Sequence, residues 1–306
     1  MATPGIPNNY SLSTTCFGNR LTNIQDQIFA AVGMGFRRIE LGLAAVPPSM
    51  DGLVESQRET GVEIPSLVAG CRDSLNGSMA VDRLGSLSVD DCERAMNSIR
   101  RHVRLARSWN CRTIVIRGSK MEEPRLRAEA RELEGRIARA KSPDDYQDDV
   151  AAFVRRAQKI SQQQIEQLCR SLYTLLQESP DVVLALEPGG NFDDLIGFDA
   201  MGWILDDLQA QGLAYWHDVG RVHLRERLGL PGQGAWLDAY GSRMVGIHLQ
   251  DAGSEEAEMP LGLGEVDFRL VSEYTPEGAE RVIEIGPRHG RAEILASVQF
   301  LSDNGF

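Results

Sequence analysis

The chain has 306 residues, a hydrophobic content of 42% and a formal net charge of −12, which together indicate a globular protein with room for a large core. The negative charge disfavours binding to a polyanion such as nucleic acid, and no apolar run reaches the roughly 18 residues of a membrane-spanning helix. Five scattered cysteines without a CxxC pair indicate reduced thiols, and residues 1–13 lack the pattern of a signal peptide, so we expect a cytoplasmic protein.

Eight short segments with the composition of β-strands recur along the chain. Several are continuously apolar and rich in Val, Ile and Leu, as expected of parallel strands that are covered on both faces. The predicted strands are residues 10–15, 36–42, 63–70, 112–118, 182–187, 213–217, 244–249 and 281–286.

Amphipathic helical patterns lie between these strands, at residues 21–34, from Ser88 onward, and at 146–178, 196–211 and 290–303. Ser88 precedes two acidic residues, which is typical of a helix amino terminus. Eight successive βα units predict one (β/α)8 TIM barrel, in a single domain that covers residues 1–306. The alternative, a doubly wound open sheet, normally has a Gly-rich turn after its first strand, and the CFGNR segment does not have one.

Residues 119–149 interrupt this alternation with a densely charged segment after the fourth strand. The stretch RLRAEARELEGRIARA predicts a helix with Glu–Arg pairs at i,i+4 spacing. The insertion is interpreted either as a solvated helix or loop, or as a lid or dimer contact at the barrel mouth.

Ionisable residues stand at the ends of the last four predicted strands, about 30 to 36 residues apart. In a barrel the carboxyl ends of the strands converge on one mouth, so these side chains should be neighbours. Three carboxylates in one mouth would repel one another, and a divalent cation would relieve that repulsion. The candidate metal ligands are Glu187, Asp218, His248 and Glu284.

The ordered motifs LALEPG, WHDVG, IHLQDA followed by PLGLGEVDF, and VIEIGP resemble the xylose-isomerase-like barrel superfamily. This superfamily contains sugar isomerases, ketose epimerases, inosose dehydratases and apurinic endonucleases. The resemblance implies that the same four residues bind one metal ion, with Glu187 and Glu284 also serving as acid/base groups. Oxygen-rich ligation with one imidazole suits Mn, which is our first expectation, or Mg, Co or Zn.

Two departures from the family pattern bear on activity. The family often has a histidine three residues after the aspartate of the sixth strand, where this chain has Arg221. This residue is predicted to hold a substrate oxygen or carboxylate, or else to lie on the helix surface. The nuclease branch needs further histidine ligands, which the corresponding positions here do not supply, so we do not expect nucleic acid as a partner.

Five further residues are weaker candidates. Glu40, Arg117, Trp216 and His217 are predicted to contact substrate, with core packing or a structural ion pair as the alternatives. Asp251 resembles a family position near His248 and is expected to orient that imidazole.

These features predict a metal-dependent isomerase or epimerase of a sugar, keto-sugar or keto-polyol, which abstracts an α-proton to form an enediolate. A keto-sugar or inosose-type dehydratase in the same fold is the nearest alternative. A catalytically inactive barrel that binds a sugar or a protein is the alternative from another class. The expected partner is a small sugar or polyol, without a membrane association, and family analogy favours a homodimer or homotetramer.

Overall fold

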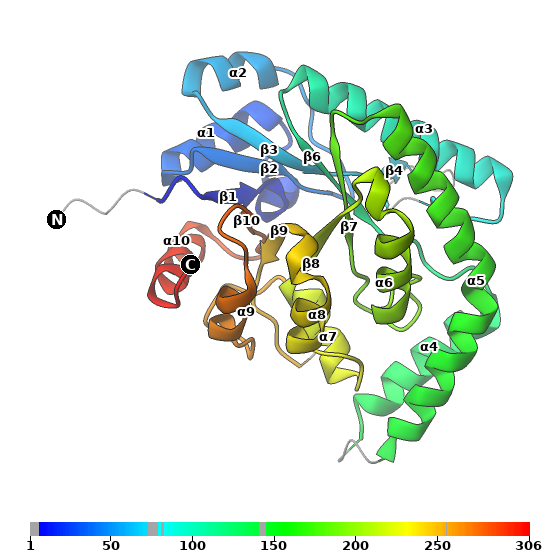
Figure 1. Cartoon of the computed structure of the whole chain (residues 1–306). Helices are drawn as coiled ribbons and strands as arrows, with labels where there is room; N and C mark the ends of the chain where they lie inside the picture. Colours follow the sequence, from blue (N-terminus) through cyan, green and yellow to red (C-terminus); the bar gives the residue numbers. More distant parts are fainter. Residues whose placement is uncertain (1–5, 73–78, 81–82, 141–144, 255) are drawn as a thin grey trace.

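The strands of this protein close into a parallel barrel. The structure, a computed structural model, describes residues 6–72, 79–80, 83–140, 145–254 and 256–306. The strand order around the barrel is β1-β10-β9-β8-β7-β6-β3-β2, and the helices lie outside the strands (Figure 1). The predicted (β/α)8 barrel is therefore confirmed, and the open sheet is excluded. Its strands are β1 (Tyr10–Ser13), β2 (Arg38–Leu41), β3 (Glu63–Val68), β6 (Thr113–Arg117), β7 (Val183–Glu187), β8 (Ala214–Asp218), β9 (Met244–Leu249) and β10 (Glu280–Ile283).

Helices occupy the places where the amphipathic patterns predict them. Further helices, which no such pattern predicted, lie at residues 53–60, 219–227, 233–240 and 268–274. Ser88 caps the helix of residues 89–108, because its hydroxyl accepts a hydrogen bond from the backbone N–H of Asp91 at 3.4 Å. Within the described residues, no helix is both long and apolar enough to cross a membrane. The α-helices are α1 (Ile24–Met34), α2 (Leu53–Thr60), α3 (Val89–Ser108), α4 (Pro124–Ile137), α5 (Gln147–Glu178), α6 (Phe198–Asp207), α7 (Val219–Arg227), α8 (Gln233–Tyr240), α9 (Phe268–Tyr274) and α10 (Arg291–Asp303).

Shorter elements complete the chain. A two-stranded antiparallel sheet of β4 (Cys71–Arg72) and β5 (Met79–Ala80) stands outside the barrel. Among the described residues, larger elements are connected by the 3-10 helices η1 (Thr14–Arg20), η3 (Gln209–Gln211) and η4 (Gly241–Arg243).

The charged insertion after β6 forms α4, and α4 lies beside the amino-terminal half of α5 (Figure 1). Its predicted helical stretch is confirmed, while residues 141–144 of the insertion lie outside the described residues. Ion pairs of Arg136 with Asp149 and of Arg156 with Glu129 join α4 to α5. The Glu134 carboxylate accepts a hydrogen bond from the backbone N–H of Phe192 at 2.9 Å, so α4 is also tied to the loop after β7.

A layer of buried, mostly small side chains fills the barrel interior. Successive side chains of a strand point to opposite faces, so residues two positions further along the same strands face inward as well. On β6, β7 and β8 and at the end of β10, these next inward positions carry charged groups rather than apolar ones. The filling layer consists of Val68, Val115, Ala185, Ala214, Trp216 and Val282. The charged positions above it are Arg117, Glu187, Asp218 and Glu284.

Trp216 forms the floor beneath these charged groups. Its side chain is fully buried, and its ring centroid lies 5.1 Å from that of His248. The indole fits because β9 has no side chain at Gly246, where an added Cβ would lie 2.1 Å from a Trp216 ring carbon. A close approach of this kind requires glycine.

We predict that Gly246→Ala lowers the free energy of unfolding by about 1–3 kcal/mol, because the new methyl group would overlap the buried indole. Chemical denaturation of the variant and the parent measures this difference. Gly234→Ala is the matched control, since its added Cβ has no neighbour within 4 Å and stands in α8, where alanine should stabilise by about 0.4–1 kcal/mol. Equal stability of the Gly246→Ala variant and the parent would contradict the packing described here.

Candidate metal centre

Glu187, Asp218, His248 and Glu284, here called the four-residue cluster, come together at the carboxyl ends of β7–β10. Each offers one ligand atom, and these four atoms all lie within 4.8 Å of one another. All four side chains are buried. The strand register produces this convergence, since Asp218 on β8 is paired with His248 on β9. The sequence-predicted ligand set is thus a spatial cluster that could hold a metal ion.

His248 is the centre of this cluster. Its Nδ1 lies 2.8 Å from Oε1 of Glu187, 3.7 Å from Oδ2 of Asp218 and 3.6 Å from Oε2 of Glu284. An imidazole nitrogen that faces three carboxylate oxygens is a mixed nitrogen and oxygen donor set. Such a set could hold a metal ion.

Glu40 holds the other side of the imidazole. Both of its carboxylate oxygens lie 3.0 Å from Nε2 of His248, and the hydroxyl of Ser66 donates to Oε2 of Glu40 at 3.0 Å. A carboxylate on the far nitrogen fixes the ring orientation of a metal-binding histidine. Glu40 lies inside the mouth as expected, although its described partners are His248 and Ser66.

Arg117 bridges two members of the four-residue cluster. Its Nε donates to Oε2 of Glu187 at 2.6 Å, and its Nη2 donates to Oε1 and Oε2 of Glu284 at 2.8 and 3.1 Å. The side chain is 7% exposed. Burial lowers the pKa of this guanidinium, but Glu187 and Glu284 outweigh burial and keep the pKa well above its usual value. Arg117 is therefore a fixed positive charge between the two glutamates.

Arg221 follows Asp218 at the start of α7. The Asp218 carboxylate caps this helix, because its Oδ1 accepts the backbone N–H of Arg221 at 2.8 Å. Its Oδ2 accepts Nε of the same arginine at 3.0 Å. The Arg221 side chain is 27% exposed, and its terminal nitrogens have no hydrogen-bond partner among the described residues. This arginine therefore reaches solvent from the edge of the site.

The charges of the site shift the pKa values of its members in opposite directions. Burial raises the pKa of Glu187, but Arg117, Arg221 and His248 outweigh burial and hold that pKa well below its usual range. The pKa of Glu284 is lowered in the same way, mainly by Arg117. The pKa of Asp218 is raised by burial and by Glu187. Burial lowers the pKa of His248, and Glu40, Glu284 and Glu187 together raise it well above the usual value.

Two residues of the loop after β9 were missed by the sequence analysis. Gln250 donates through Nε2 to Oδ1 of Asp218 at 3.0 Å and to Oε2 of Glu284 at 3.4 Å. Its Oε1 accepts the backbone N–H of Glu258 at 2.6 Å, and Glu258 has a positive φ of 58°. Burial and the charge of Glu284 raise the pKa of the Glu258 carboxyl. Strand alternation from His248 was the available signal for Gln250, whereas Glu258 had none.

The structure gives Asp251 a role different from the expected one. Its carboxylate accepts hydrogen bonds from the backbone N–H groups of Ala252, Gly262 and Val266 at 2.9, 2.8 and 3.2 Å, rather than orienting His248. A Cβ at Gly264 would lie 2.3 Å from Oδ1 of Asp251. Asp251 therefore shapes the loop that carries PLGLGEVDF, and Glu40 takes the position beside His248.

His217 and Trp216 do not line an open substrate space. His217 faces out of the barrel, because it alternates with the inward-facing Asp218. Its Nδ1 lies 2.6 Å from the hydroxyl of Tyr215, and its Nε2 lies 2.8 Å from Oε1 of Gln233. Trp216 faces inward but is covered by His248. These two predicted substrate contacts therefore stand apart from the accessible side of the site.

The burial of His217 predicts a pH dependence of stability. Burial lowers the pKa of His217 from 6.5 to about 4. The unfolded chain then binds more protons than the folded one between these values, so stability falls as the pH drops below about 6.5. We predict that His217 lowers the free energy of unfolding by about 2 kcal/mol between pH 7 and pH 5, against the opposite effect of the raised pKa of His248. Denaturant titrations of the parent and of His217→Gln at both pH values measure this contribution. The same change between pH 7 and pH 5 in both proteins would contradict the assignment.

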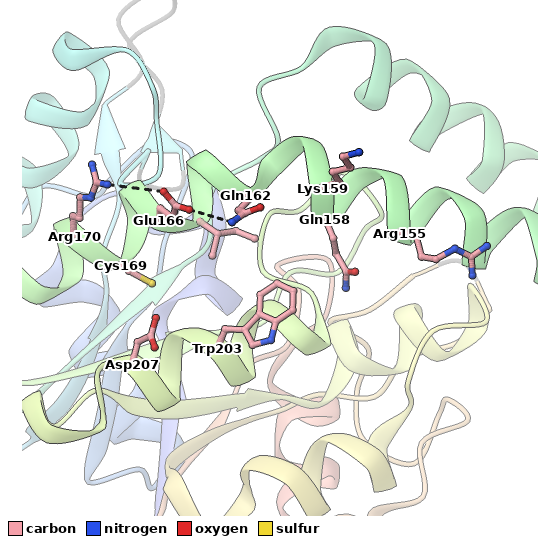
Figure 2. A pocket seen from close by; sticks show the side chains of 10 residues that line it. Arg155, Gln158, Lys159, Gln162, Glu166, Cys169, Arg170, Trp203 and Asp207 are labelled. Carbon is pink, nitrogen blue, oxygen red and sulfur yellow. Dashed lines mark hydrogen bonds and ion pairs between the residues drawn. The ribbon is translucent and has the colours of Figure 1, made fainter.

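Two of the cavities among the described residues lie near the barrel but outside the four-residue cluster. One of about 460 Å³ adjoins the ends of β1 and β2, at Thr14 and Gly42, and is mainly apolar. The other, of about 760 Å³, lies between α5 and α6 on the outer surface. Figure 2 shows Trp203 and Cys169 in this second cavity, with Glu166 paired to Arg170 at its rim.

Comparison with known proteins identifies the fold. No family model and no curated protein matches the sequence. D-psicose 3-epimerase from Clostridium cellulolyticum H10 has a similar structure, with a TM-score of 0.67 and 11% identity, over 97% of this chain and 99% of that one. For 3-keto-D-glucoside 4-epimerase from E. coli the TM-score is 0.63 and the identity 14%, over 97% and 100% of the two chains.

A family 2 AP endonuclease from Brucella melitensis is also similar, with a TM-score of 0.65 and 11% identity over 94% of this chain and 96% of that one. At such identities the likeness shows the fold alone, since the neighbours include both sugar epimerases and a protein named as a nuclease. The resemblance seen in the sequence motifs is confirmed at this level, because the matches include a xylose isomerase domain containing protein from Salmonella typhimurium and a protein from Rhodospirillum rubrum that is named as a xylose isomerase.

Proposed function

We propose that this chain, which has the fold of the xylose-isomerase-like barrels, is a divalent-metal-dependent sugar isomerase or epimerase. The observation that carries the proposal is the four-residue cluster, in which one imidazole nitrogen faces three buried carboxylates. The names of several structural neighbours, which are epimerases of ketoses or keto-sugars, support the substrate class.

The donor set fits a metal ion. Nδ1 of His248 and one oxygen each of Glu187, Asp218 and Glu284 would hold the ion, while Glu40 would keep Nδ1 directed at it. We propose manganese, because three carboxylates and one imidazole form an oxygen-rich set. When bound, the ion would polarise a substrate carbonyl and stabilise the negative charge of an enediolate.

The chain's own residues would carry the proton. One of Glu187 and Glu284 would abstract the proton α to the carbonyl, and the other would return a proton to the same carbon or its neighbour. Arg117 favours the ionised form of both glutamates, which is the form that the base requires. The glutamate that returns a proton would first have to take one up from solvent, and the base would later release its proton to solvent. Arg117 also occupies one oxygen of Glu187 and both oxygens of Glu284, so proton transfer requires these contacts to be exchanged for substrate.

The edge of the site would contact the rest of the sugar. Arg221 presents its terminal nitrogens to solvent beside the four-residue cluster, and these would donate to substrate oxygens. Because Arg221 lies beside Asp218, its donor groups would also assist the loss of a hydroxyl group from the substrate. A dehydratase is therefore the second candidate function. The mass of the product separates these outcomes, because dehydration removes one water molecule and isomerisation does not.

Metal content tests the centre directly. We expect about one divalent ion per chain, bound by the four-residue cluster, in protein dialysed without chelator, and we expect its loss in Glu187→Gln. Elemental mass spectrometry measures both. Asp193→Asn is the control, since Asp193 is paired with Lys120 outside the cluster and its loss should leave the metal content unchanged. A parent chain that binds no divalent ion even after its addition would leave an inactive sugar- or protein-binding barrel as the better interpretation.

The acid/base assignment makes a separate prediction. Glu284→Gln should slow exchange of the substrate α-proton with solvent deuterium by at least about 100-fold, because the amide cannot accept that proton. Proton NMR on a panel of unphosphorylated and phosphorylated keto-sugars measures the exchange. Full turnover by Glu284→Gln on every substrate that the parent accepts would show that another group transfers the proton.

A further inference from the structure

Arg117 and Glu284 reach toward each other from opposite sides of the barrel. In the strand order, β6, which carries Arg117, stands four positions from β10, which leads into Glu284. Four positions in a barrel of eight strands is the opposite side. The hydrogen bonds of Arg117 to Glu187 on the neighbouring strand and to Glu284 on the opposite side therefore place its guanidinium in the middle of the mouth.

The guanidinium touches an oxygen that a metal ion would use. Oε2 of Glu284 is an oxygen that faces Nδ1 of His248, at 3.6 Å, and Nη2 of Arg117 lies 3.1 Å from it. Arg117 also holds Oε1 of Glu284 and Oε2 of Glu187, so it contacts three of the four oxygens of these two ligands.

Arg117 cannot release the carboxylates of Glu187 and Glu284 by losing its proton. Guanidinium stays protonated throughout the accessible pH range, unlike the ammonium of a buried lysine. A divalent ion entering the cluster would therefore meet a permanent positive charge a few ångströms away, in a buried site where screening is weak.

We propose that Arg117 is the resident counter-cation of this centre and competes with the divalent metal for Glu187 and Glu284. The inference rests on the proposed metal-dependent function and concerns the regulation of the same site. Arg117 holds the carboxylates together when the metal is absent, and metal entry exchanges the Arg117 contact with Glu284 for a metal contact. The parent chain should therefore bind the metal more weakly than a chain that has the same four ligands but lacks Arg117.

The test is the affinity for Mn²⁺, measured by titration calorimetry on the parent chain, Arg117→Met, Arg117→Lys and Lys120→Met. Arg117→Met removes the charge and should bind Mn²⁺ at least about tenfold more tightly than the parent. Arg117→Lys keeps a positive charge but cannot bridge both carboxylates, so its affinity for Mn²⁺ should lie between those of the parent and of Arg117→Met. Lys120→Met removes a nearby cation that is paired with Asp193 and Asp194 rather than with the ligands, and its affinity should stay within about threefold of the parent.

Thermal unfolding gives a second readout. Without metal, Arg117→Met leaves buried carboxylates uncompensated and should melt at a lower temperature than the parent. Mn²⁺ should then raise its melting temperature by more than it raises that of the parent. If Arg117→Met fails to fold, Arg117→Lys carries the affinity comparison. Equal or weaker Mn²⁺ binding by the folded Arg117 variants would overturn the proposal.

These outcomes separate the two proposals. A parent chain and Arg117→Met that bind Mn²⁺ equally well would overturn the competition and leave the metal-dependent function standing. A parent chain that binds no Mn²⁺, beside an Arg117→Met that binds about one ion per chain, would support the competition and contradict metal dependence in the natural chain.

Discussion

The compensation of buried carboxylates is the constraint on which the rest of this site depends. Glu40, Glu187, Asp218 and Glu284 are each at most 1% exposed, and an uncompensated buried carboxylate is very costly. Positive or proton-donating groups therefore have to reach them inside the barrel. Arg117, Arg221 and His248 do so, and each of them contacts at least one of these carboxylates.

This compensation links opposite sides of the barrel. His248 on β9 joins Glu187 on β7 to Glu40 on β2, and Arg117 joins β6 to the end of β10. The cross-barrel contacts fix the side-chain orientations at the mouth, while Trp216 and the small residues below them exclude water from the interior. The donor atoms of the four-residue cluster therefore converge in fixed positions, within 4.8 Å of one another.

The sequence predicted the members of the four-residue cluster better than their surroundings. Strand composition and the spacing of the βα units identified Glu187, Asp218, His248 and Glu284, because residues at strand ends share a mouth whatever the detailed packing. His217 directly precedes Asp218, and Asp251 belongs to the same IHLQDA motif as His248. Yet the His217 side chain is hydrogen-bonded to Gln233, and the Asp251 carboxylate binds the backbone of a loop. Neighbouring residues of a strand point to opposite faces, so His217 does not share the face of Asp218. Membership of a motif does not determine which hydrogen-bond donors a carboxylate such as that of Asp251 contacts.

The sequence by itself determined the barrel, its strand boundaries to within a few residues, and the identity of the converging ionisable groups, because these follow from periodicity and from the order of the units. Only the tertiary structure decided the partners: that Glu40 would hold His248, that Gln250 would join Asp218 to Glu284, and that Arg117 would span the mouth between two glutamates. Such contacts join strands that are far apart in the chain. They depend on barrel closure and register, which bring those strands face to face and which no local pattern of residues contains.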